Sequence, residues 1–563
     1  MSRWAMPRLH ATMTREATGP CGSRATPVPR LRAVFRIGAV SLCAALWPAP
    51  ASAQDHPGKA TYDKWCAGCH GEDGKADGPG ADHMLPRPRN FVQAQYQIRT
   101  TASGSLPTDA DILRVIDEGM PGTAMPGWKN SLSDRERRDL VGYLKAFSRF
   151  FETDKPQLVE FPKAPGGSDA LVTQGRDAYQ TLQCFKCHGD AGRGDGPSAP
   201  TQKDGNNWPV RPADLSQNWL FNGGGTAEDI YQRFRTGLDG TPMPTFSDAL
   251  DAGVVNEEQL WGLAYYVRSM APAGEQPTVR EVIEAKRVEG SLPASPDDSV
   301  WSAIEPSWVP LVGQIIVKPR WFSPAVTGVW VQAVHDGTDL VMRLVWDDRS
   351  NSPDPLWSEW RNRVTEVMQP KEDALAAAPV ESGPAAGEAG QTLAVPESPD
   401  AIAVWFPRKI PSGMERPYFF MGNTREPVYL WHWQSRGPAQ EMLGRGPGSM
   451  DPLPAGNGLA AQSVFDRGQW RVTLRRPLAA TDSTNALSFA SGQPIPVAFF
   501  AWDGDNGEHD TKGALSTWYF VYLGEPTPKS VYTTPLIATL LTAGLGFFFV
   551  GRAQRRERER NGG

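Results

Sequence analysis

Two short motifs, each with two cysteines and a histidine, are the residues of this chain best placed to do chemistry. Residues 66–70 read CAGCH and residues 184–188 read CFKCH. This C-x-x-C-H pattern attaches c-type haem, because the two thiols can bond the vinyl groups and the adjacent histidine can reach the iron. A zinc site or disulfides would use the same cysteines, but neither explains why a histidine follows both pairs. We therefore predict two covalently bound haem c groups, with thioether bonds at Cys66, Cys69, Cys184 and Cys187 and iron ligation at His70 and His188.

An internal repeat supplies candidates for the sixth ligand of each iron. At an offset of 118 residues, segment 122–126 (GTAMP) falls on segment 240–244 (GTPMP). Met125 and Met243 thus each lie 55 residues after their haem histidine. Methionine opposite histidine is the usual ligand pair of electron-carrier cytochromes c. Met120 is the local rival in the first copy, but Leu238 takes its place in the second.

The segments around the two motifs resemble small class I cytochrome c domains, which are all-helical folds around one haem. We place these domains at residues 54–155 and 165–275. Each copy closes with an amphipathic stretch, at 140–144 and 263–267, whose spacing suits a helix packed on the haem domain. The resemblance does not name the electron donor or acceptor, because unrelated complexes use such domains.

Length and composition indicate several folded domains. The chain has 563 residues, of which 40% are apolar, so it can bury more than one core. Its 51 prolines, 56 glycines and 20 tryptophans favour irregular or β-rich domains beside the helical ones. With 57 Lys and Arg against 63 Asp and Glu and no basic stripe, we expect no nucleic-acid partner.

Both ends of the chain carry signals for export and membrane anchoring. Residues 1–36 contain seven Arg and one Glu, residues 37–47 are uncharged, and Ala-Ser-Ala at 51–53 suits a signal peptidase, so 1–53 is interpreted as a signal peptide. Residues 530–551 are 22 positions without a charge, enough for a transmembrane helix. Five Arg follow in 552–563, and positive charge stays in the cytoplasm. We expect a protein of the inner membrane with a single C-terminal span and its bulk in the periplasm.

Residues 279–525 show the alternating pattern of β-strands. Segments 329–334 and 340–346 flank a turn and predict a hairpin. Further strands are expected at 402–406, 428–433, 470–474, 496–502 and 518–523, which together favour a β-sandwich. Residues 371–399 have few aromatic or β-branched residues and are expected to form a mobile surface insert.

This third domain resembles the haem b-binding gamma subunits of dimethyl sulfoxide reductase-type molybdenum enzymes, such as ethylbenzene dehydrogenase and the chlorate, selenate and dimethylsulfide oxidoreductases. The resemblance rests on segments 309–311, 319–320, 343–348 (RLVWDD), 420–423 (FMGN), 428–433 and 501–504 (AWDG), with Glu508 and Lys512. It implies a β-sandwich that holds one non-covalent haem b between Met421 and Lys512. His335 and His432 are alternative ligands, and a Met and His pair would instead resemble the cytochrome domains of extracellular sugar dehydrogenases. Gamma subunits usually lack both c-type domains and a membrane tail, so the fusion departs from that family.

The expected architecture is therefore multidomain, with two all-α cytochrome c domains, one haem-binding β-sandwich and one C-terminal transmembrane helix. No nucleophile and base pair, Rossmann glycines, P-loop or molybdenum site is visible, so we expect an electron-transfer subunit and not a catalyst. The resemblance implies a molybdenum catalytic subunit and an iron-sulfur subunit on one side, and a soluble cytochrome c or terminal oxidase on the other. Two alternatives stay open: a dihaem oxidoreductase that acts on a small inorganic substrate, and a β domain that binds a ligand without haem b.

Overall fold

The computed structural model describes residues 56–272, 276–368, 396–411, 421–454, 456–525 and 530–562. The expected signal peptide at 1–53, residues 371–395 of the expected insert and Phe420 lie outside the described residues.

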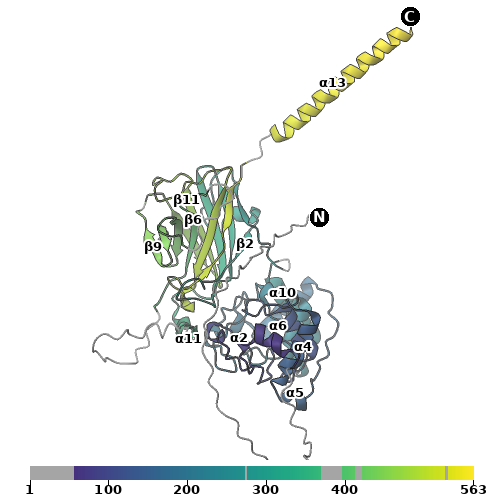
Figure 1. Cartoon of the computed structure of the whole chain (residues 1–563), viewed down its shortest axis with the longest axis vertical. Coiled ribbons are helices and arrows are strands. Elements are labelled where there is room, and N and C mark those ends of the chain that lie inside the picture. The colour runs from purple at the N-terminus through teal and green to yellow at the C-terminus, as the bar shows by residue number, and fades with distance from the viewer. Residues whose placement is uncertain are drawn as a thin grey trace, which may run out of the picture. The chain divides into compact units, whose positions relative to one another are not determined.

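Short helices form the first helical region (Figure 1). They pack around a cluster with several aromatic side chains. Thr108 and Ser133 begin the two longer helices with reciprocal capping boxes. The apolar faces of these helices meet around Tyr62, Ile112 and Leu140, and Cys66 packs at the edge of this cluster. The helices of the region are α1 (Lys59–Trp65), α2 (Ala67–His70), α3 (Asp109–Glu118), α4 (Asp134–Ala146) and α5 (Phe150–Thr153), with a 3₁₀ turn η1 (Ala81–His83).

The second helical region repeats the order of the first. Its helices α6, α7, α8 and α10 follow one another as α1, α2, α3 and α4 do. Glycines at the crossing of α6 and α10 allow the backbones to touch, since a Cβ on Gly175 would lie 2.0 Å from the Gly262 oxygen. The helices are α6 (Asp169–Thr181), α7 (Phe185–His188), α8 (Ala227–Thr236), α9 (Ser247–Asp251) and α10 (Glu257–Met270), with 3₁₀ turns η2 (Ala199–Thr201) and η3 (Asn218–Leu220).

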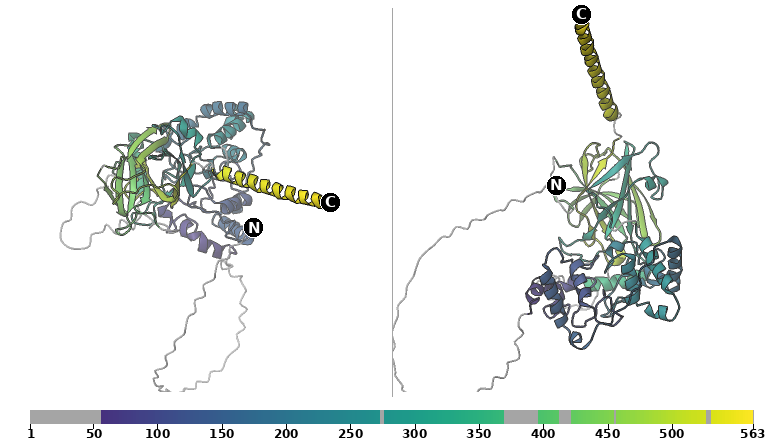
Figure 2. Two further views of the ribbon diagram at one scale, coloured as in Figure 1. Left: turned by 90° about the horizontal axis from the view of Figure 1, so that it is seen from above. Right: turned by 90° about the vertical axis from the view of Figure 1, so that its right-hand side faces the viewer.

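A large mixed sheet that folds over on itself makes up the third region (Figures 1 and 2). Its main path runs β10-β11-β5-β4-β1-β14-β12-β6-β7-β8-β9, and β1 is parallel to both of its neighbours. The strands are β1 (Val282–Arg287), β2 (Ser307–Pro310), β3 (Val312–Gly313), β4 (Gly328–His335), β5 (Asp339–Asp347), β6 (Ala401–Pro407), β7 (Val428–Gln434), β8 (Gln440–Gly446), β9 (Ser449–Pro452), β10 (Ala460–Phe465), β11 (Gln469–Pro477), β12 (Pro494–Trp502), β13 (Ala514–Leu515) and β14 (Tyr519–Leu523). The non-strand elements are α11 (Ser358–Met368), η4 (Ser299–Ala303), η5 (Pro355–Trp357) and η6 (Gly504–Asn506).

Strand β12 is where the sheet turns into a sandwich. Its first half pairs with β14 and its second half, from Ala498, pairs with β6. One core is filled from both layers, with Val331 and Leu344 from one and Val404 and Trp431 from the other. The expected sandwich and the hairpin of β4 and β5 are therefore confirmed.

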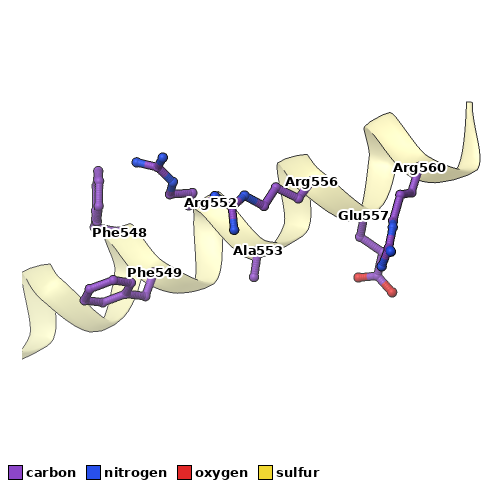
Figure 3. A pocket seen from close by; sticks show the side chains of 7 residues that line it. All are labelled: Phe548, Phe549, Arg552, Ala553, Arg556, Glu557 and Arg560. Atoms are coloured by element: carbon purple, nitrogen blue, oxygen red, sulfur yellow. The ribbon is translucent and has the colours of Figure 1, made fainter.

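The C-terminal helix α13 (Ser530–Asn561) is longer than the expected span of 530–551. It is long and apolar enough to cross a membrane, and its described side chains are not buried against the rest of the chain. Figure 3 shows the boundary on this helix where Phe548 and Phe549 give way to Arg552, Arg556 and Arg560. The helix does not stop at that boundary, because Arg and Glu are good helix formers.

Candidate haem-binding sites

The first C-x-x-C-H motif forms helix α2, which the chain enters directly from α1. The amide of Cys69 lies 3.1 Å from the carbonyl oxygen of Cys66, and the amide of His70 lies 2.9 Å from the same oxygen. The ring Nδ1 of His70 lies 2.9 Å from the Arg89 carbonyl oxygen. Since a carbonyl only accepts, Nδ1 carries the proton and Nε2 keeps the lone pair that an iron needs. Burial lowers the pKa of His70, which favours the neutral imidazole.

The second motif has the same arrangement. Nδ1 of His188 lies 2.9 Å from the Ala213 carbonyl oxygen, and burial again lowers the pKa of the histidine. A tyrosine hydroxyl donates to the glycine after each haem histidine, from Tyr62 to Gly71 at 2.7 Å and from Tyr179 to Gly189 at 2.6 Å. The structure therefore gives both histidines the same orientation, although their amino-acid surroundings differ.

The two candidate methionines lie in equivalent loops. The amide of Met120 donates to the Met125 oxygen at 3.0 Å, and the amide of Leu238 donates to the Met243 oxygen at 3.1 Å. A threonine hydroxyl closes each loop at 2.7 Å, Thr123 onto Met120 and Thr241 onto Leu238. Met120 is thus the counterpart of Leu238, and Met125 that of Met243. Met243 packs at the edge of the same cluster as Cys184. Ligation by the two thioethers stays a prediction.

Residues near the first motif fit a haem chemically. The hydroxyl of Tyr96 and the indole nitrogen of Trp128 are buried and have no hydrogen-bond partner among the described residues. Both side chains pack on the cluster that Cys66 joins. Haem propionates are acceptors that such donors could bind. Burial raises the pKa of the Cys66 thiol to about 11, so it is a protonated thiol before any haem is attached.

A second apolar cluster covers the outer face of strands β6, β7, β8 and β12, opposite the sandwich core. We call it the outer cluster. Alternate residues of the strands supply most of it, because successive side chains point to opposite faces. Three of its strand positions are alanines, Ala401, Ala403 and Ala498, which leaves little side-chain bulk there. Its buried members are Ala401, Ala403, Trp405, Met421, Val428, Leu430, Met442, Ala498, Phe500, Trp502, Leu515 and Trp518.

Met421 and Lys512 both lie near the turn between β8 and β9, beside the outer cluster. Met421 is fully buried, has a left-handed backbone (φ +54°), and accepts a hydrogen bond on its carbonyl from the Gly446 amide at 3.0 Å. Two residues on, a Cβ on Gly448 would lie 3.8 Å from the Thr511 methyl, next to Lys512. The Lys512 ammonium nitrogen lies 5.8 Å from the centre of the Trp321 ring. An apolar, alanine-lined face with a buried Met and a nearby Lys fits the haem b that the family resemblance implies.

The two alternative histidines lie in different places. His432 faces the outer cluster, with its ring 5.8 Å from that of Trp502 and with Ala403 opposite it on β6. Burial lowers the pKa of His432 to about 4, so it is a neutral base. His335 lies at the end of β4, where its Nε2 is 2.8 Å from the carbonyl oxygen of Gly524. It is not part of the outer cluster that contains Met421. Of the two, only His432 lies against the outer cluster, to which Met421 belongs.

Trp321 is a residue of the site region that the sequence did not single out. It is 1% exposed, donates from its indole to Glu508 at 3.0 Å, and shares a buried cluster with Ala199 of the second helical region. Leu85 of the first helical region packs on that cluster. Ala199, Leu85 and Glu508 lie about 120 to 240 residues from Trp321 in the chain, so no local pattern could have indicated these contacts.

Three family models match separate parts of the chain. Residues 53–144 match cytochrome C oxidase, cbb3-type, subunit III, residues 172–271 match cytochrome c, and residues 298–450 match ethylbenzene dehydrogenase. These matches correspond to the two helical regions and to much of the sandwich.

Two curated relatives align with about half of the chain. A respiratory nitrate reductase heme subunit of Haloferax mediterranei is 25% identical over 293 residues, which is 52% of this chain and 87% of the relative. The chlorate reductase subunit gamma of Ideonella dechloratans is 27% identical over 254 residues, which is 44% of this chain and 87% of that one.

Solved structures also show similarity. A reducing HAO-like protein complex of Kuenenia stuttgartiensis is 43% identical and covers 38% of this chain and 96% of that one, with a TM-score of 0.36. A family 9 carbohydrate binding module of Caldicellulosiruptor kristjanssonii is 8% identical, with 44% of this chain and 97% of that one covered and a TM-score of 0.23.

Proposed function

Because the chain joins two cytochrome c domains to a domain of the ethylbenzene dehydrogenase gamma-subunit type, we propose that it carries electrons between a molybdenum oxidoreductase and the respiratory chain through one haem b and two haems c. The chain is an electron-transfer subunit and not the catalyst. His70 with Met125 and His188 with Met243 would hold the c haems, and Met421 with Lys512 would hold the b haem. The bound irons supply one-electron redox chemistry, and the protein sets their spacing and ligands.

The observation that carries this proposal is the buried link between the candidate sites. Lys512 lies over Trp321, and the cluster of Trp321 includes Ala199 and contacts Leu85, one residue from each helical region. The carbonyl that orients His70 belongs to Arg89, and a Cβ on Gly240, in the Met243 loop, would lie 3.3 Å from the guanidinium of Arg89. A chain of close contacts between redox sites is what an electron relay requires, whereas a catalyst would need an open coordination position.

The relatives favour a partner of the nitrate or chlorate reductase kind. We propose a molybdenum catalytic subunit and an iron-sulfur subunit that exchange electrons with the haem b site, and a soluble cytochrome c or terminal oxidase that exchanges them with the c haems. The substrate class of the complex would be nitrate or nitrite, chlorate, selenate or a hydrocarbon.

We further propose a location for each part. Residues 1–53 would be removed on export, residues 54–155 and 165–275 would be the cytochrome c domains, and 279–525 would be the haem b domain in the periplasm. Residues 530–551 would cross the inner membrane and leave 552–563 in the cytoplasm. The apolar α13 with its basic end supports this topology.

The test is a haem count on the purified full-length chain. Acid-acetone extraction should remove one haem and leave two bound, because thioethers resist extraction and axial bonds do not. The double variant Cys184→Ala with Cys187→Ala should retain one. If it still retained two covalent haems, the assignment of the second motif would be wrong, and a chain without extractable haem would contradict the gamma-subunit role.

A further inference from the structure

Three buried aspartates that no haem site uses lie together at one end of the sandwich. Asp348 follows β5, Asp400 precedes β6 and Asp503 follows β12. One carboxylate oxygen from each lies within 4.8 Å of the other two, and the three residues are 4%, 0% and 4% exposed. Asp348 and Asp503 belong to the RLVWDD and AWDG segments, whose acidic residues have no part in the haem assignments.

Among the described residues, no Lys, Arg or His nitrogen lies within 4.0 Å of these three carboxylates. Arg349 is near enough to favour the charged forms of Asp348 and Asp503, and Arg211 is near enough to favour that of Asp503. Three buried negative charges at this spacing need either protons or a cation.

Two neighbouring acids, Asp505 and Glu508, have partners for their carboxylate oxygens. Asp505 pairs with Arg361 at 2.8 Å. Glu508 accepts from the Trp321 indole at 3.0 Å and from the Ala325 amide at 2.8 Å. Asp505 therefore has an ion-pair partner and Glu508 has donors for both of its oxygens, whereas one oxygen of Asp348 has no donor among the described residues.

An oxygen without a donor points to a ligand at this place. Oδ2 of Asp348 is buried and has no hydrogen-bond partner among the described residues, and its other oxygen accepts only from the Ser350 amide at 3.3 Å. Asp400, by contrast, accepts from the Gly504 amide, the Ser352 amide and the Trp470 indole. A buried carboxylate oxygen without a donor is costly, and its lone pairs are the ones a cation would use.

The donor set selects the kind of cation. All candidate ligand atoms are carboxylate oxygens, which suit hard cations and not zinc or copper. Ca²⁺ accepts an irregular set of oxygen ligands, whereas Mg²⁺ requires near-ideal octahedral geometry and usually keeps several of its waters. A buried group of three carboxylates from separate strand ends therefore suits Ca²⁺ better than Mg²⁺. We propose that Asp348, Asp400 and Asp503 bind one calcium ion, with water or backbone oxygens completing its coordination.

Such an ion would join the two layers of the sandwich. Asp348 ends a strand of one layer, and Asp400 and Asp503 lie at the ends of β6 and β12, which pair in the other layer. β6 and β12 also carry Ala403 and Ala498 of the outer cluster. The ion would stabilise that end of the domain whether or not the domain holds haem b, so the inference does not rest on the proposed function.

The test is calcium content and thermal unfolding of the full-length chain in detergent. We expect about one calcium per chain by mass spectrometry after purification in calcium. EGTA should lower the unfolding midpoint of the β domain, and CaCl₂ should restore it while an equal concentration of MgCl₂ does not. Asp348→Asn should weaken calcium binding by about ten-fold or more. Glu441→Gln is the matched control, a buried carboxylate bonded to Tyr429 and Asn457, and should keep the calcium response.

The direction in which Asp348→Asn shifts the unfolding midpoint distinguishes a bound cation from protons shared among the aspartates. With a bound ion, the substitution lowers the midpoint in calcium. If the aspartates share protons and bind no ion, the substitution removes one repelling charge and raises the midpoint with or without calcium. Wild-type protein without stoichiometric calcium, and with the same midpoint in EGTA and millimolar CaCl₂, would overturn the proposal even if the variant failed to fold.

Discussion

Met125 and Met243 hold matching positions in two loops closed by the same hydrogen bonds. Replacing Met125 by His should lower the potential of one c haem by on the order of 100 mV, because imidazole favours ferric iron more than a thioether does. A redox titration that resolves the haems measures this shift. Met120→Leu is the control, since Leu238 occupies the equivalent position, and both potentials should stay unchanged. A shift in the control variant instead would make Met120 the ligand.

Lys512 and His432 compete for the second axial position at the outer cluster. We expect Lys512→Ala to loosen the extractable haem and change its absorption spectrum, because the iron would lose one ligand. His432→Ala and Lys409→Ala, the latter at an exposed lysine, should leave the spectrum as it is. A spectrum that responds to His432 and not to Lys512 would make the sugar-dehydrogenase cytochromes the better resemblance.

The sequence was informative about single residues where a motif or a repeat marked them. The two C-x-x-C-H motifs and the equal spacing of Met125 and Met243 are of that kind. Trp321, Arg99 and the carboxylate of Asp400 could not be found this way, because the partners that give them a role, such as Ala199, Asp239 and the other two aspartates, lie far away in the chain.

Among the elements, the loop that carries Met243 is held by a residue of the other helical region. The buried guanidinium of Arg99 lies 2.7 Å from Asp239 and donates to the Thr236 oxygen at 2.6 Å. Arg99→Ala should destabilise the helical regions by about 3 kcal/mol, because the substitution breaks a buried ion pair and leaves Asp239 without it. It should also weaken the spectral signature of Met ligation in one c haem only. Thermal unfolding and the ferric absorption spectrum measure the two effects.

Arg138→Ala, which removes an exposed arginine of α4, is the control for this change. Equal loss of Met ligation in both c haems would contradict a local effect through Asp239 and indicate general unfolding of the helical regions.

Strands with continuous or alternating apolar residues could be predicted, and others could not. β4, β5, β6, β7, β11, β12 and β14 were expected, and they supply most of the sandwich core. β10 was missed because it is largely exposed beyond β11 and carries little apolar signal. β8 was missed because Gly444 and Gly446 break its pattern, although Gly444 is needed where the Val428 side chain comes within 2.9 Å of a possible Cβ.

At the scale of the whole molecule, the regions are joined by the buried cluster around Trp321 and by single charged residues. Arg193 of the second helical region pairs with Asp347 of β5 at 2.8 Å, and Arg211 donates to the carbonyl oxygens of Pro324 and Ser323. The sequence predicted three separate domains but not these contacts, because an isolated arginine between helices has no periodic signal. Because these contacts do not involve α13, we expect the helical regions and the sandwich to stay in contact without the membrane helix.

Truncation after Gly524 tests the anchor and the independence of the remaining chain together. None of the buried clusters described above contains a residue of α13, so the truncated protein should keep its haems and fold. Without the apolar helix it should appear in the soluble periplasmic fraction, where the full-length chain should be in washed membranes. Haem-stained gels of the two fractions measure this. A truncated protein that stays in washed membranes but is released from cells lacking the neighbouring subunits would mean that a bound partner holds it. Labelling of the Arg-rich end of α13 from the periplasmic side of intact cells would contradict the proposed orientation.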